Sequence, residues 1–107
     1  MSVMKSLVIW MSVLMIALAV PMAMRMVPPN SLYGFRTPKT MGDERIWYEA
    51  NQKSGINLIA AGVLTLLVWG LLWMRVGIGR ANFIGFPVFL VLLTVSFVVS
   101  FVQLQKM

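Results

Sequence analysis

The chain has 107 residues, the size of a single domain. Of these residues 60% are apolar and 11% are charged, whereas soluble domains have ~45–50% apolar and ~25% charged residues, so a water-soluble globule is excluded. The chain contains neither cysteine nor histidine, which excludes disulfides, thiolate metal sites and the commonest general base, and its net charge of +6 is interpreted as a membrane-topology signal rather than a nucleic-acid footprint.

Residues 6–24 are the first predicted element, an apolar segment without a charge. Its length is the ~20 residues that a helix needs to cross a hydrocarbon core of ~30 Å. Because Lys5 precedes the apolar run, the segment also resembles a secretory signal peptide. Residues 21–25 lack the small-x-small cleavage pattern, so an uncleaved transmembrane helix is the favoured interpretation.

Residues 25–55 form a long loop in which the charges concentrate. Prolines 28 and 29 end the first helix and begin an extended run. Thr40 and Asp43 have the spacing of a capping box. We therefore expect a helix that starts near Met41 and runs toward Gly55, with at most a short break there before the second membrane span.

The predicted loop helix has two different sides. One side is solvated, with charges of alternating sign at Arg45, Glu49 and Lys53. The opposite side carries a carboxylate, an indole, an amide and a glycine without a side chain, at Glu44, Trp47, Asn51 and Gly55. A carboxylate on a partly buried side needs a partner, so we predict that Glu44 forms a salt bridge with Arg36 that fastens the extended run to the helix.

Residues 56–74 and 81–102 are two further charge-free segments long enough to span a membrane. The link between them holds Gly77 and Gly79, which predicts a tight hairpin of antiparallel helices. Asn82 is expected to cap the third helix. The predicted fold is thus an all-α membrane protein, one domain over residues 1–107, with three transmembrane helices and an amphipathic cytoplasmic loop helix before the second span.

The orientation follows from the basic residues on each side of the membrane. Three lie on the side of the N-terminus, namely Lys5, Arg75 and Arg80. Six lie on the other side, namely Arg25, Arg36, Lys39, Arg45, Lys53 and Lys106. The positive-inside rule therefore places the loop and the C-terminus in the cytoplasm and the N-terminus outside the cytoplasmic (inner) membrane.

The three predicted spans contain no Asp, Glu, Lys or Arg, which disfavours a proton or ion pump. Their few polar residues are interpreted as helix-packing contacts, with a substrate path as the alternative: Ser12, Asn57, Thr65, Thr94, Ser96 and Ser100. Three helices are also few enough to be compatible with a homodimer.

The candidate site lies in the loop. One interpretation is an interfacial belt with Trp47 and Tyr48 as anchors. The other is a binding site, in which Arg36 and Lys39 meet an anionic lipid headgroup near a helix N-terminus. The candidate ligand- or partner-binding residues are Asn30, Tyr33, Arg36, Thr37, Lys39, Thr40, Glu44, Trp47 and Asn51. No catalytic residue, metal ligand or cofactor is predicted.

The same loop resembles the SdpI family of small bacterial membrane proteins. The resemblance rests on Asn30, the run Tyr33-Gly34-Phe35-Arg36-Thr37-Pro38-Lys39-Thr40, and then Glu44, Trp47, Asn51 and Gly55 leading into a transmembrane helix. The chain resembles the C-terminal three-helix portion of a longer family namesake. The resemblance implies immunity against a secreted peptide toxin and capture of a repressor at the membrane.

The leading functional hypothesis is a non-enzymatic membrane protein that protects against or senses a membrane-active peptide, or binds a lipid or protein partner, through residues 25–55. A second hypothesis is a membrane enzyme acting on lipid-linked substrates, with Glu44 as acid or base and with Arg36 and Lys39 holding phosphate. A third is a small oligomeric channel or transporter. Membrane lipids, a peptide toxin or a protein are the expected partners, and nucleic acid is not.

Overall fold

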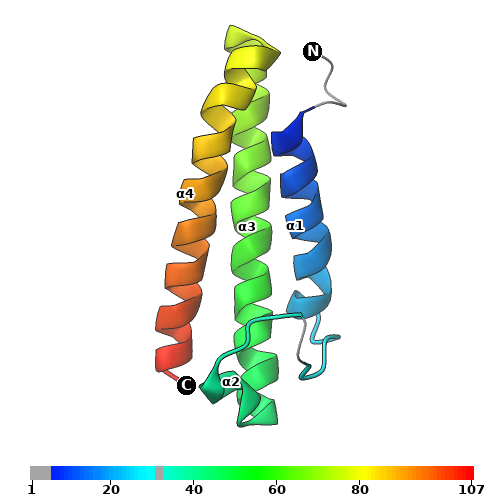
Figure 1. Ribbon diagram of the computed structural model, residues 1–107, viewed down its shortest axis with the longest axis vertical. Helices are drawn as coiled ribbons and strands as arrows, with labels where there is room; N and C mark the ends of the chain where they lie inside the picture. Colours follow the sequence, from blue (N-terminus) through cyan, green and yellow to red (C-terminus); the bar gives the residue numbers. More distant parts are fainter. Residues whose placement is uncertain (1–5, 31–32) are drawn as a thin grey trace.

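The computed structural model describes residues 6–30 and 33–107. Within them the chain forms four α-helices, α1 (Leu7–Ala23), α2 (Pro38–Met41), α3 (Glu44–Val76) and α4 (Ile78–Gln105). Figure 1 shows α1 and α4 flanking the long central α3, with α2 and the C-terminus at one end and the α3–α4 turn at the other. Lys5, one of the basic residues on which the predicted orientation rests, lies outside the described residues.

The central helix α3 runs without interruption from the loop into the apolar segment. Its 33 residues correspond to a length of ~50 Å at 1.5 Å per residue, well beyond a hydrocarbon core of ~30 Å. The loop helix thus continues without a break into the apolar segment that was predicted to be the second span. Gly55 does not break α3, because one glycine costs only ~1 kcal/mol in a helix.

Glycine at position 55 instead brings α1 close to α3. A Cβ atom there would lie 2.6 Å from the backbone nitrogen of Ala23 and 2.8 Å from the carbonyl oxygen of Ala19. About two turns further along α3, a Cβ atom at Gly62 would lie 2.6 Å from the side chain of Ile16. Small residues that let helix backbones approach are the common packing device of membrane helices.

The start of α3 differs from the prediction. Asp43, not Thr40, is the N-cap, and its carboxylate accepts hydrogen bonds from the backbone nitrogens of Arg45 at 2.9 Å and Ile46 at 3.4 Å. Thr40 belongs to the separate four-residue helix α2, which ends at Met41 and has Gly42 as its C-cap. Thr37 caps α2, with Pro38 at the first helical positions, where its missing N–H costs nothing.

Helices α3 and α4 form the predicted antiparallel hairpin, and the turn between them is tighter than expected. Gly77 alone links the two helices, with φ at +84°, a value that favours glycine. Because α4 already begins at Ile78, Asn82 lies inside the helix and the prediction that it caps the helix is wrong. Its side-chain oxygen instead accepts hydrogen bonds from Ser6 Oγ at 2.6 Å and Trp69 Nε1 at 2.8 Å, which joins all three long helices.

Much of the outer surface is apolar. Large hydrophobic side chains are exposed along all three long helices, for example Leu14 on α1, Leu71 on α3 and Phe97 on α4. By length and hydropathy α3 and α4 could each cross a membrane, and α1 is a shorter apolar helix of 17 residues. Buried apolar side chains gather at the two ends of the bundle, around Trp69 near the α3–α4 turn and around Trp47 near the loop.

Candidate functional site

Two buried residues one turn apart on α3 hold the loop against the bundle. Trp47 has no exposed surface, and its indole nitrogen donates a hydrogen bond of 2.8 Å to the carbonyl oxygen of Val27. Asn51 is 2% exposed, and its Oδ1 accepts a bond of 2.6 Å from the backbone nitrogen of Phe35. Both side chains thus meet backbone groups of a loop that has no regular structure of its own there.

The amide of Asn51 is used on both sides. Its Nδ2 donates to the carbonyl oxygen of Trp47 at 2.9 Å and, more weakly, to that of Phe35 at 3.4 Å. The loop can approach this amide because residue 34 is glycine. Gly34 has a φ of +113°, and a Cβ atom there would lie 2.7 Å from Asn51 Oδ1. Asn51 and Gly34 therefore act as a matched pair.

Asn30 and Tyr33 shape the turn that precedes this contact. Asn30 Oδ1 accepts a hydrogen bond of 2.7 Å from the backbone nitrogen of Tyr33, and its Nδ2 donates to the carbonyl oxygen of Pro28 at 2.8 Å. The hydroxyl oxygen of Tyr33 is buried and has no hydrogen-bond partner among the described residues. Desolvation by burial raises the pKa of this phenol, because the phenolate is the form that burial penalises.

Thr37 and Thr40 close the extended run with a reciprocal pair of hydrogen bonds. The backbone nitrogen of Thr40 donates to Thr37 Oγ1 at 3.1 Å, and the backbone nitrogen of Thr37 donates to Thr40 Oγ1 at 2.7 Å. Thr40 is fully buried. Two of the predicted site residues thus form the capping box of α2.

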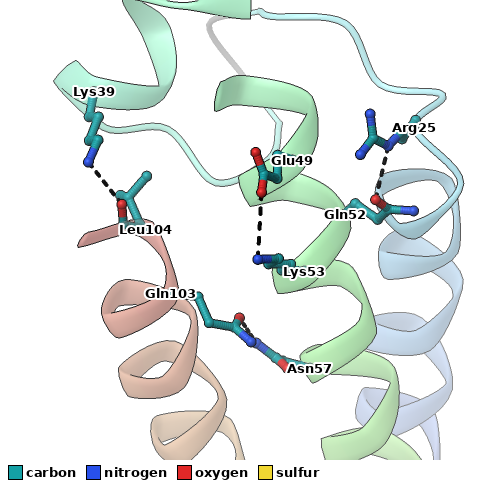
Figure 2. Close-up of polar contacts among 8 residues, drawn as sticks. All are labelled: Arg25, Lys39, Glu49, Gln52, Lys53, Asn57, Gln103 and Leu104. Atoms are coloured by element: carbon teal, nitrogen blue, oxygen red, sulfur yellow. Dashed lines mark hydrogen bonds and ion pairs between the residues drawn. The ribbon is translucent and has the colours of Figure 1, made fainter. Parts of the chain in front are cut away.

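Lys39 lies between these threonines and ties α2 to the end of α4. Its ammonium donates a hydrogen bond of 3.0 Å to the carbonyl oxygen of Leu104 (Figure 2). The last carbonyls of a helix have no partners within the helix and carry partial negative charge, so a lysine is favourable there. Lys39 consequently brings the C-terminal end of the chain to the loop.

The predicted salt bridge between Glu44 and Arg36 is wrong. Glu44 is exposed in the first turn of α3, where a carboxylate is stabilised by the helix N-terminus. Among the residues that the structure describes, one ion pair is present, between Lys53 Nζ and Glu49 Oε1 at 3.6 Å (Figure 2). It belongs to the predicted solvated ladder. The loop is therefore fastened by the buried Trp47 and Asn51, and not by opposite charges.

The charged residues of segment 25–42 are all basic. Residues 25–42 contain Arg25, Arg36 and Lys39 and no acidic residue. Arg25 and Lys39 bond to neutral oxygens, Arg25 through Nε to Gln52 Oε1 at 2.9 Å and Lys39 to a backbone carbonyl (Figure 2). Arg36 is exposed. Among the described residues, Arg25 and Lys39 are therefore bonded to neutral oxygens and form no ion pair.

An elongated cavity of about 460 Å³ lies next to this segment, between α1 and α4. Its walls are apolar side chains of α1 and α4, such as Met15 and Leu93, with Leu58 contributing from α3. Residues 33–35 of the loop border it. The loop therefore both carries the cations and forms part of the wall of an apolar cavity.

Sequence reasoning brought together only part of this site. Asn51 does meet the loop at Phe35 and Trp47 meets it at Val27, whereas Glu44 stands apart at the exposed start of α3. It missed the role of Gly34, whose signal was a glycine in the motif facing a buried asparagine. Asn57 donates to Ser100 Oγ at 2.9 Å, in agreement with the interpretation of both residues as helix-packing contacts. Its second bond, to Gln103 Oε1 at 3.0 Å (Figure 2), was not predicted and also joins α3 to α4 near the loop.

The chemistry available here is hydrogen bonding, positive charge and an apolar cavity. Within residues 6–30 and 33–107, no group of three or more His, Cys, Asp or Glu side chains is placed to hold a metal ion. Asp43 caps α3, Glu44 lies in its first turn and Glu49 pairs with Lys53. The groups near the cavity are therefore suited to binding.

Comparison with known proteins places the chain in a family. Residues 26–102 match the SdpI/YfhL protein family, a range that covers the loop, α2, α3 and most of α4. The chain is also 36% identical over 85 residues to a Bacillus subtilis (strain 168) protein described as the uncharacterized protein YfhL, with 77% of this chain and 69% of that protein covered. No solved structure matches significantly. The chain is thus a membrane protein that belongs to the SdpI/YfhL family.

Proposed function

We propose that the chain crosses the bacterial cytoplasmic membrane three times. In support, the 17 residues of α1 are at the short end of the ~17–25 that span a bilayer, and α1 runs alongside α3 with exposed apolar side chains. Of the basic residues that the structure describes, Arg75 and Arg80 flank the α3–α4 turn, and the others lie within residues 25–53 or just after α4, at Lys106. By the positive-inside rule, the loop and C-terminus then face the cytoplasm and the N-terminus lies outside.

Within the membrane, the proposed function is to protect against or sense a membrane-active peptide, through binding by residues 25–55 and without catalysis. The observation that carries this is the way the loop is held. Buried Trp47 and Asn51 hold the loop backbone at Val27 and Phe35, and the neighbouring Arg36 is exposed. A preorganised segment loses little conformational entropy on binding, which favours recognition.

The chemistry of the proposed contact is that of arginine. A guanidinium offers a planar fork of donors that matches a carboxylate, such as a peptide C-terminus or an acidic side chain of a protein partner. The resemblance to an immunity protein supports a peptide as the ligand. The lack of histidine and cysteine, together with the structural use of Asp43 and Glu49, supports binding rather than an enzymatic role.

The test compares Arg36→Ala, Arg36→Lys and Arg45→Ala in cells challenged with a membrane-active peptide toxin. Membrane level and the thermal unfolding midpoint of each purified variant are measured in parallel. We expect Arg36→Ala to lose protection and Arg36→Lys to lose much of it, since lysine cannot form the bidentate contact. Arg45→Ala is the matched control, because it removes the same charge from residues 25–55 at an exposed position of the solvated ladder. Equal effects at positions 36 and 45, or full protection by Arg36→Ala, would contradict the proposal.

A further inference from the structure

The cavity between α1 and α4 is open along the side of the bundle. Its rim includes Leu14, Leu18 and Phe97, which are 60%, 49% and 55% exposed. These side chains belong to helices that pack extensively on α3 and only sparsely on each other. In a bilayer such an opening faces the lipid chains rather than water.

The size and lining of the cavity fit a hydrocarbon chain. A volume of about 460 Å³ is within the ~300–1,000 Å³ of ligand-binding pockets. Tyr33 and Ser54 are the residues with a side-chain hydroxyl on a wall that otherwise consists of aliphatic, methionine and phenylalanine side chains and one glycine. The cavity runs along α1 from Met11 to Met22, so it is elongated along that helix, as an acyl chain is in a bilayer.

Basic residues in the loop segment that borders one end of the cavity favour one kind of lipid. The loop residues 33–35 that border the cavity belong to segment 25–42, which has three basic and no acidic residues. Arg25 and Lys39 donate to neutral oxygens. A phosphate at this end would add the negative charge that the segment lacks, and each basic residue near an anionic lipid contributes a factor of about five in affinity.

We propose that this cavity binds one acyl chain of an anionic membrane phospholipid, with its phosphate at the loop end beside segment 25–42. The lipid lies between α1 and α4 and beneath residues 33–35. The site is distinct from the outward-facing contact proposed for Arg36 and a peptide, and it does not depend on that function. It assigns the protein a resident lipid of defined headgroup charge.

The experiment uses the full chain in vesicles that contain phosphatidylglycerol or phosphatidylcholine with a photoactivatable group midway along one acyl chain. After illumination, mass spectrometry of peptides locates the crosslinks. We expect labelling of the cavity-lining methionines 11 and 15 and of Leu93. The anionic lipid should label them at least fivefold more than the zwitterionic lipid, and excess unlabelled phosphatidylglycerol should suppress this labelling.

Variants separate the cavity from general lipid contact. Leu93→Trp fills the cavity and should reduce labelling of Met11 and Met15 at least fivefold, whereas Leu67→Trp, at a 59% exposed position of α3 that does not line it, should not. Lys39→Gln should lower the preference for phosphatidylglycerol about fivefold, and Arg75→Gln at the opposite end should not. Equal labelling by both lipids, labelling spread evenly over the exposed face of α3, or no competition by unlabelled lipid in the unsubstituted protein would overturn the proposal.

Discussion

Removing the side chain of Asn51 should release the loop from α3. Asn51→Ala deprives the backbone nitrogen of Phe35 of its 2.6 Å acceptor and the carbonyl of Phe35 of a weaker donor at 3.4 Å. A buried donor without a partner costs ~1–3 kcal/mol, and the weaker bond contributes ~0.5–1 kcal/mol. The carbonyl of Trp47 lies inside α3 and keeps its helical partner. We therefore expect the loop to be destabilised by roughly 2–3 kcal/mol.

Hydrogen exchange of the protein in detergent or nanodiscs measures this locally. The probes are the indole N–H of Trp47 and the backbone N–H of Tyr33, which bond to Val27 and Asn30 and not to residue 51. A loss of 2–3 kcal/mol corresponds to exchange that is ~30- to 150-fold faster, since ~1.4 kcal/mol is tenfold. Both probes should respond, because the loop is held as one unit.

The matched control is the neighbouring residue. Gln52→Ala removes a single exposed hydrogen bond, the one from Arg25 Nε at 2.9 Å, which is worth ~0.5–1.5 kcal/mol at most, so exchange of the two probes should change by only a few-fold. Asn51→Asp keeps an acceptor for the backbone N–H of Phe35 but adds a buried charge. Exchange of the two probes should therefore be faster than in Gln52→Ala. Unchanged protection of Trp47 and Tyr33 in Asn51→Ala would refute the idea that this amide holds the loop.

Three further predictions concern packing, titration and the opposite end of the bundle. Gly55→Ala should separate α1 from α3 and lower the unfolding midpoint, because its Cβ would meet α1 backbone at 2.6 Å, whereas Gly70→Ala, with nothing within 4 Å, should stabilise the helix by ~0.5–1 kcal/mol. Because burial raises the pKa of Tyr33, its contribution to stability is complete below pH ~10 and is lost as the pH rises through the higher pKa of the folded state. Unfolding followed from pH 9 to 12 should show this loss, and Tyr33→Phe should reduce it. Asn82→Leu removes the shared acceptor of two donors, including the Trp69 indole, and should cost ~2–4 kcal/mol in thermal or denaturant unfolding.

Periodicity predicted which side of α3 each residue lies on. It did not predict how far along α3 the loop covers that side. The predicted mixed side comprised Glu44, Trp47, Asn51 and Gly55, and the last three are buried as a stripe at this spacing should be. Glu44 shares their direction around the axis, yet it lies in the first turn, beyond the part of α3 that the loop covers. A helical pattern gives an angle around the axis, and the extent of a contact along the axis depends on tertiary structure.

The helix start was wrong for a related reason. Thr37 and Thr40 both precede a polar residue by three positions, so the capping-box spacing occurs twice in succession. Pro38 distinguishes them, since proline suits the first position of a helix and therefore marks Thr37 as a cap. Asp43 was then left to cap α3. The all-α architecture and the hairpin needed no such discrimination, because long apolar segments and a two-glycine link specify them.

The arrangement around α3 implies that the loop and the α1–α4 opening are mechanically linked. Each outer helix packs mainly on α3, through Gly55 for α1 and through Asn57 for α4. The α1–α4 cavity therefore has few direct contacts across it, and segment 25–42 connects its two sides: it continues from the end of α1, and Lys39 bonds to the last turn of α4. Any ligand that separates α1 from α4 must displace this segment or lengthen its bonds to Trp47 and Asn51. The exchange rates of the Trp47 indole N–H and of the backbone N–H of Phe35, which donates to Asn51 Oδ1, should consequently report occupancy of the cavity, even though neither the Trp47 nor the Asn51 side chain lines it.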